Sequence, residues 1–301
     1  MKDWERTLKT SLKRRWKRYR QALKRCQRKF SEKAVHASRV ETRRLLSLVE
    51  LLNVFLGQRH LKKTRRILKR HLDAFDPLRD TQVQLLLLAK QRRQFPETKA
   101  FHRMLAGREE RCLKTAARRI ERVKIRPLQK VFRRLGRQLA RTRGATAQRT
   151  RHRAAVMNAV RDAFTKTLEL QRAVDPGAAE TIHRTRIAFK RFRYMVEALQ
   201  PLFAEITPER VAAMQDFQSM MGEVQDTEVF LARLDKYTRG DEARARMLAR
   251  FRRGLLVQHT AQITYCLKHA DRLLAFWPLK NGASDPPATA QRARRAAPLP
   301  P

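Results

Sequence analysis

Apolar residues near the N-terminus recur at alternating steps of three and four, the spacing of a single stripe along an α-helix. The stripe consists of Leu8, Leu12, Trp16, Tyr19, Leu23, Cys26 and Phe30. Most positions between these residues are basic. The pattern predicts a long helix that packs against the rest of the protein along one narrow seam.

Similar patterns and end signals predict helices along most of the chain. Ser31 is a candidate N-cap for a helix that ends near Leu56, where Gly57 is a candidate C-cap. The next helix spans residues 59–75, and another starts at 76 and contains a buried Leu-rich stretch at 83–88. Further helices are predicted over residues 99–125, 156–168, 180–199, 209–221, 224–237 and 242–276.

Composition indicates an all-α fold, because the 301 residues include only nine Gly and twelve Pro and are rich in helix formers. Residues 128–150 contain Gly136 and Gly144 and are predicted to bridge two halves, about 1–140 and 145–280. Residues 281–301, with several prolines, basic residues and no aromatic residue, are predicted to be a disordered tail.

A short motif, His-x-x-Arg-aliphatic-x-x-basic-Arg, occurs twice. One copy begins at His36 and the other at His183, 147 residues later. A second landmark, Asp-Thr-x-Val, begins at Asp80 and again at Asp226, 146 residues later. Two landmarks at nearly the same separation indicate a duplicated structural unit.

The charge of the chain is strongly positive, with 70 Lys and Arg against 28 Asp and Glu and a formal net charge of +42. A compact protein with this charge repels itself unless a polyanion neutralises it. The cations are spread along most of the chain, unlike a nuclear-targeting run or a disordered basic arm. We therefore expect a basic folded body with a polyanionic partner.

Each motif places its cations on one face of a helix. The two stripes are His36, Arg39 and Arg43, and His183, Arg186, Lys190 and Arg193. Successive cations lie about 5 Å apart along the axis, and the guanidinium fork matches phosphate oxygens. If a pseudo-two-fold axis brings the helices together, they line a basic groove or channel suited to a linear phosphate polymer.

Two alternatives remain open for these residues. A charged stripe is often only a solvated helix face, although its repetition at the same spacing favours a binding role. For His36 and His183, a structural hydrogen bond is as plausible as ligand contact.

Arg44 and Arg191 lie nearer the apolar sides of their helices, where a cation needs a partner. Asp80 and Asp226 recur in step with them. We therefore predict one internal ion pair in each half, between Arg44 and Asp80 and between Arg191 and Asp226.

At these residues the sequence resembles the CHAD family, the conserved histidine α-helical domain, over about residues 1–280. The resemblance implies two four-helix bundles related by pseudo-two-fold symmetry around a basic central pore that binds inorganic polyphosphate, and some members associate with polyphosphate granules. The implied binding residues are His36, Arg39, Arg43, Arg44, His183, Arg186, Lys190, Arg191 and Arg193. Leu46 stands where the second copy has Arg193, which makes the first side of the expected pore less cationic.

Arg14 and Arg18 on the first helix are additional candidates for the polyphosphate site, although they are equally suited to the outer surface. Many relatives carry an N-terminal triphosphatase domain marked by Glu-x-Glu-x-Lys. No such motif precedes the first helix here, so the resemblance does not imply hydrolysis.

Several function classes fit the sequence less well. No Gly-rich phosphate loop, Gly-x-Ser-x-Gly or His-Glu-x-x-His motif is present, so we expect a binding protein and not an enzyme. Non-specific DNA or RNA binding is the main alternative, since counterion release rewards any phosphate backbone. Only 7% of residues are aromatic, which leaves few platforms for base stacking. A membrane-surface or acidic-protein adaptor fits less well.

The remaining expectations concern location and cofactors. Cys26, Cys112 and Cys266 are widely separated and fit reduced cysteines of a core, and no Cys/His cluster with zinc spacing occurs. We expect no cofactor and no metal. The charged N-terminus lacks the apolar region of a secretory signal, and no apolar run is long enough to cross a membrane. These features predict a cytoplasmic protein, with an option of granule association, and leave its oligomeric state open.

Overall fold

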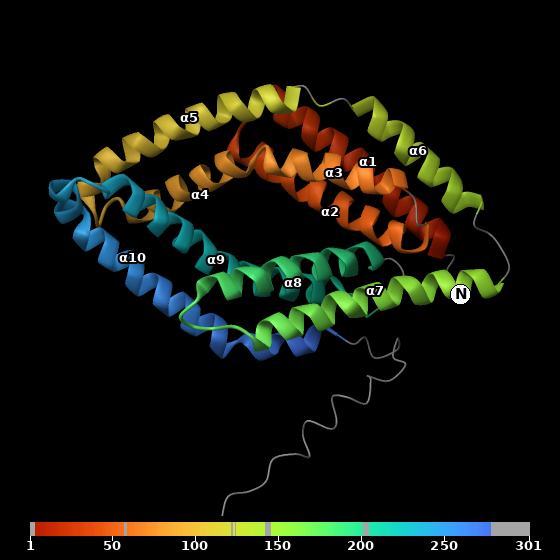
Figure 1. Cartoon of the computed structure of the whole chain (residues 1–301). Coiled ribbons are helices and arrows are strands. Elements are labelled where there is room, and N and C mark those ends of the chain that lie inside the picture. Colours follow the sequence, from red (N-terminus) through yellow and green to blue (C-terminus); the bar gives the residue numbers. More distant parts are fainter. Residues whose placement is uncertain are drawn as a thin grey trace, which may run out of the picture.

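The computed structural model describes residues 4–56, 59–121, 123, 125–141, 146–200 and 205–277, and these residues form helices and short connections without a β-strand. The predicted all-α class is therefore confirmed. α2 (Glu32–Leu56) packs against α8 (Ala179–Leu199), and each also packs against the helix that precedes it, α1 (Trp4–Arg28) or α7 (Thr146–Arg172). Figure 1 shows α2 and α8 in the interior of the molecule.

α1 has the predicted single apolar seam, and its stripe from Leu8 to Cys26 is buried. α2 then begins with the predicted cap, because the Ser31 hydroxyl accepts a hydrogen bond from the Ala34 amide at 3.3 Å. The chain continues through α3 (Arg59–Asp73), α4 (Asp76–Gln91), a 3-10 turn at Pro96–Thr98 and α5 (Lys99–Glu121).

The Leu-rich stretch of α4 is less buried than predicted. Leu88 is buried, but Leu85 and Leu87 are half-buried and Leu86 is 49% exposed. A helix can bury its whole circumference only when neighbours surround it. α4 packs mainly against α5 and more lightly against α9 and α2, so the run of leucines extends beyond the covered face.

The segment 128–150, predicted to bridge the two halves, begins within a helix that the sequence analysis did not predict, α6 (Ile125–Arg141). Leu128, Phe132, Leu135 and Leu139 are buried along one side of this helix, which packs against α1. The basic residues between them hid a stripe with ordinary helical spacing. Residues 142–145 lie outside the described part.

The second half also differs from the prediction at one point. α9 (Pro208–Thr238) is a single helix that runs through Gly222, where two helices were expected. Its N-cap is Thr207, whose hydroxyl accepts from the Arg210 amide at 3.2 Å. α10 (Glu242–Lys268) follows and leads into a 3-10 segment at Ala270–Phe276. The predicted tail at 281–301 lies outside the described residues.

The buried residues form a large core around α1, α2, α7 and α8 and a smaller core where α4 and α5 meet α9 and α10. Phe101 and Phe230 stack in the smaller core with ring centroids 5.8 Å apart. Figure 1 shows α5 and α10 converging at that end of the molecule.

Cys26 and Cys266 are buried and Cys112 is half-buried, all three as free thiols. None of the helices in the described ranges is both long and apolar enough to span a membrane.

α1 and α3 are joined by a buried hydrogen bond of 2.7 Å between the Tyr19 hydroxyl and Nδ1 of His71. Burial lowers the pKa of His71 to about 4, and the nearby Arg70 adds to the effect. The folded pKa lies below the unfolded value, so the unfolded state takes up the proton first. The stability contributed by neutral His71 is complete above pH 6.5 and is lost as the pH falls toward 4.

We predict that lowering the pH from 7 to 5 reduces the free energy of unfolding by about 2 kcal/mol through His71 alone. Urea denaturation at both pH values measures this. His71→Gln keeps a hydrogen-bonding partner for Tyr19 but does not titrate, so the variant should be less acid-sensitive by that amount. An equal pH dependence in the two proteins would contradict this assignment.

Candidate functional site

A cavity of about 690 Å³ lies between α2, α4, α8 and α9 and is lined by residues from both copies of the repeated motif. The structure thus brings together side chains that are 147 residues apart in the chain. The predicted residues that line the cavity are His36, Arg39, Arg43, Arg44, His183, Arg186, Lys190 and Arg193.

Three predicted residues lie elsewhere. The Arg191 side chain is 62% exposed and its Nε lies 3.4 Å from a carboxylate oxygen of Glu50. Arg14 and Arg18 are exposed on α1 and do not line the cavity. The structure therefore separates these three cations from the other eight candidates.

The predicted Arg–Asp pairs are wrong. Arg44 instead lies 3.0 Å from Glu41 on its own helix and 3.2 Å from Glu197 on α8. Its partner across the helix interface comes from α8 because α2 packs against that helix. A repeated landmark identifies equivalent positions, but it does not tell which helix lies next to which.

Some of the cavity cations are held by partners within the protein. Arg39 forms an ion pair of 2.5 Å with Asp76 and donates to the Leu72 carbonyl at 3.1 Å. Arg193 pairs with Glu197, donates to Gln218 at 3.0 Å, and stacks on the Tyr194 ring at 4.3 Å. These contacts fix the guanidinium groups and neutralise part of their charge.

The other cavity cations are different. Arg43, Arg186 and Lys190 form no ion pair or hydrogen bond with any described residue of the chain. Burial lowers the pKa of all three, and Arg43 and Arg186 further lower that of Lys190, which falls well below its ordinary value. The site therefore holds mutually repelling positive groups that form no ion pair, although Asp226 partly offsets the charge of Arg186 and Asp76 partly offsets that of Arg43.

The two motif histidines also line the cavity. Burial lowers the pKa of His36, and the charge of Arg79 adds to it; burial lowers that of His183, with a further effect from Arg186 and Lys190. Both imidazoles are thus biased toward the neutral form.

Sequence analysis missed part of the lining. Arg79, which pairs with Glu32, stands directly before the Asp80 landmark and could have been found from that position. The wall contributed by α9 carries uncharged polar side chains with no such signal, namely Gln215, Gln218, Ser219 and Gln225.

Burial raises the pKa of Asp80, and the carboxylates of Asp76 and Asp226 raise it further. Across the described ranges, no group of three or more His, Cys, Asp or Glu is placed to hold a metal ion.

Asp76 and Gly222 make the two copies of the motif unequal. Gly222 follows Asp76 by 146 residues, the separation of Asp80 and Asp226. Arg39 is neutralised by Asp76, whereas its counterpart Arg186 lies flat against the glycine, where an added Cβ would be 3.4 Å from the Arg186 Nε. The copy with glycine in place of Asp76 supplies the guanidinium that forms no ion pair.

Comparisons with known proteins agree with this architecture. The family model of the CHAD domain matches residues 10–235. The crystal structure of the CHAD domain from the plant Ricinus communis has a TM-score of 0.70 and 17% sequence identity, covering 91% of this chain and 92% of that chain. Comparison with curated protein sequences gives no significant match. Since the family model covers well over half of the residues, the chain belongs to the CHAD domain family.

Proposed function

We propose that this protein binds inorganic polyphosphate in the cavity between the two motif helices. The observation that carries the proposal is the group of unpaired cations, Arg43, Arg186 and Lys190, which converge from α2 and α8. Seven cationic side chains line the cavity against three carboxylates. Confined positive groups without a counter-charge are costly, and a bound polyanion offsets that cost.

The proposal includes the symmetry of the site. The two halves are duplicated units, and their cation stripes face each other across a basic pore that a bare phosphate chain enters lengthwise. The residues at about 5 Å intervals then engage successive phosphates. Affinity consequently rises with chain length, and the same contacts attach the protein to polyphosphate granules. The activity is stoichiometric binding, without turnover of the polymer.

Nucleic acid is the competing polyanion. Its phosphates attract the exposed cations of the outer helices through counterion release. A duplex is too broad for a cavity of about 690 Å³, so its phosphates do not reach Lys190. The two polyanions therefore differ in which cations they need.

We predict that Arg43→Gln combined with Lys190→Gln weakens long-chain polyphosphate binding at least a hundredfold, because a charge-assisted hydrogen bond contributes about tenfold or more. Fluorescence anisotropy of labelled polyphosphate at near-physiological salt measures the change. Arg14→Gln combined with Arg191→Gln removes the same charge outside the cavity and should change the affinity by no more than about threefold.

Duplex DNA at matched phosphate concentration serves as the competitor in the same titration. It should fail to displace polyphosphate from the unaltered protein. If the two double variants lose equal affinity, or if DNA competes equally, the confined site is refuted and diffuse surface charge explains the binding.

We predict net proton uptake on polyphosphate binding at pH 7. The pKa values of Lys190, His36 and His183 are lowered in the free protein, and an adjacent polyanion raises them. Binding is therefore tighter at pH 6 than at pH 8. Calorimetry in buffers of different ionisation enthalpy counts the protons, and Lys190→Arg, which does not titrate there, should reduce the count. Zero uptake or proton release would contradict the charge arrangement.

Gly222→Asp should weaken polyphosphate binding about tenfold, because it places a carboxylate beside Arg186 as Asp76 lies beside Arg39. Gly222→Ala adds only a Cβ at ordinary contact distance and is the matched control. The same anisotropy titration compares the two variants. Equal affinities for Gly222→Asp and Gly222→Ala would show that the charge state of Arg186 does not govern binding.

A further inference from the structure

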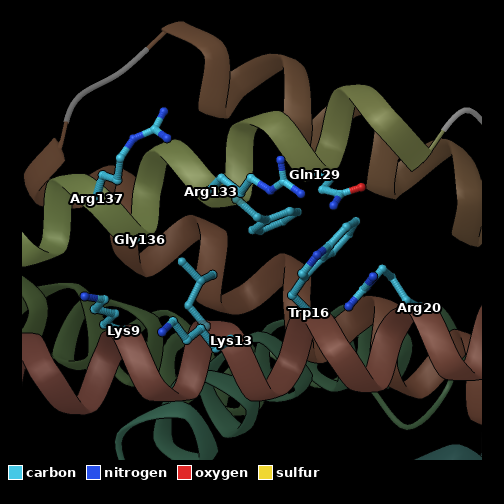
Figure 2. A pocket seen from close by; sticks show the side chains of 10 residues that line it. Lys9, Lys13, Trp16, Arg20, Gln129, Arg133, Gly136 and Arg137 are labelled. Carbon is cyan, nitrogen blue, oxygen red and sulfur yellow. The ribbon is translucent and has the colours of Figure 1, made fainter.

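A second hollow lies away from the cavity, in the groove between α1 and α6, with a volume of about 580 Å³. Figure 2 shows Lys9 and Lys13 along the α1 side and Gly136 and Arg133 along the α6 side. The volume falls within the range of small-molecule sites. Neither copy of the repeated motif contributes to this groove.

The floor of the groove is apolar and its rim is cationic. Leu12, Trp16 and Phe132 are buried at its base, with 2%, 9% and 5% of their surface exposed. The rim consists of Lys9, Lys13, Arg20, Arg133 and Arg137, and none of the described lining residues is a carboxylate. A ligand for this site combines an apolar body with a negative end.

Aliphatic bodies fit the floor better than planar bases. The Trp16 ring is already stacked against Phe132 at 4.6 Å and Tyr19 at 5.5 Å, and the Arg20 guanidinium lies 5.5 Å from its centroid. The Trp16 ring is thus already engaged by contacts within the protein, and among the described lining residues Gln129 is the one uncharged polar side chain that could read the edge of a nucleobase. An alkyl chain needs only apolar contact.

Gly136 provides the space for such a chain. A Cβ added at Gly136 would meet no atom within 4 Å, so this side of α6 is open toward the groove. The apolar floor is recessed between two helices and can be reached by a single inserted chain. Lys13 and Arg133 stand on opposite rims, where they can hold the anionic end.

We propose that the α1–α6 groove binds one monomeric alkyl chain with an anionic end group, either phosphate or carboxylate. The alkyl body covers Leu12 and Trp16, and the cations of both rims bind the end group. This site is separate from the polyphosphate cavity and does not rest on its function.

Calorimetry with n-decyl phosphate below its micelle concentration tests the proposal on the full chain. Affinity should rise up to about fourfold per methylene from hexyl to decyl phosphate, the equivalent of roughly 0.8 kcal/mol per buried CH₂. Inorganic phosphate, decanol and adenosine monophosphate should bind at least about tenfold more weakly than decyl phosphate. Equal binding by the nucleotide would overturn the aliphatic assignment.

Two variants locate the site. Gly136→Leu fills the groove and replaces a helix-interior glycine with a better helix former, so the protein folds and decyl phosphate binding falls at least about tenfold. Lys13→Glu with Arg133→Glu should have a similar effect, whereas Lys17→Glu with Arg134→Glu, an equal charge reversal at exposed positions outside the groove, should not. Polyphosphate affinity should be retained in Gly136→Leu, which separates a failure here from a failure of the cavity proposal.

A final experiment measures binding of the protein and of Gly136→Leu to vesicles of anionic phospholipid. If the protein binds vesicles and Gly136→Leu leaves both vesicle and decyl phosphate binding unchanged, the cations act as a flat basic surface and the groove proposal is overturned. Loss of decyl phosphate binding in Gly136→Leu supports a monomeric ligand.

Discussion

Glu197 is the residue that allows two cationic helices to lie side by side. Its carboxylate, 4% exposed, contacts Arg193 on its own helix and Arg44 on α2 at 3.2 Å. Glu41 lies 3.0 Å from Arg44 and completes the network. Without these carboxylates, α2 and α8 would bring buried guanidinium groups together with nothing to offset their repulsion. The network holds the motif helices close and leaves the cations farther along the cavity unpaired.

The sequence predicts a helix correctly where burial of one apolar face is enough to determine how that helix packs. The α1 seam is an example, since its apolar residues need cover from one side only. α6 has a comparable stripe, but its Gly136 and dense basic residues suggested a linker. α9 continues through Gly222, which lies against Arg186, a tertiary contact that helix propensity does not contain.

For the candidate site, too, the sequence predicts features set by spacing along one helix and misses those set by contacts between helices. The motif identifies the residues of the cavity because their spacing on a helix is local. It fails for Arg191, whose side chain lies on the outer surface, and for the partners of Arg44, which depend on how α2 meets α8. The glutamine wall of α9 carries no periodic signal. Spacing thus predicts which side chains share a face, and packing decides which of them are neutralised.

The two proposed anion sites differ less in their number of cations than in the surroundings of those cations. In the cavity, Arg43 and Arg186 repel Lys190 and lower its pKa. A polymer with a negative charge on every unit therefore offsets the most repulsion. In the α1–α6 groove the cations are on the rim, where water screens them, and the buried surface is apolar. Binding there is governed by the alkyl body, while the charge selects its end group. An anion that binds only the folded chain at either place also stabilises the fold by mass action.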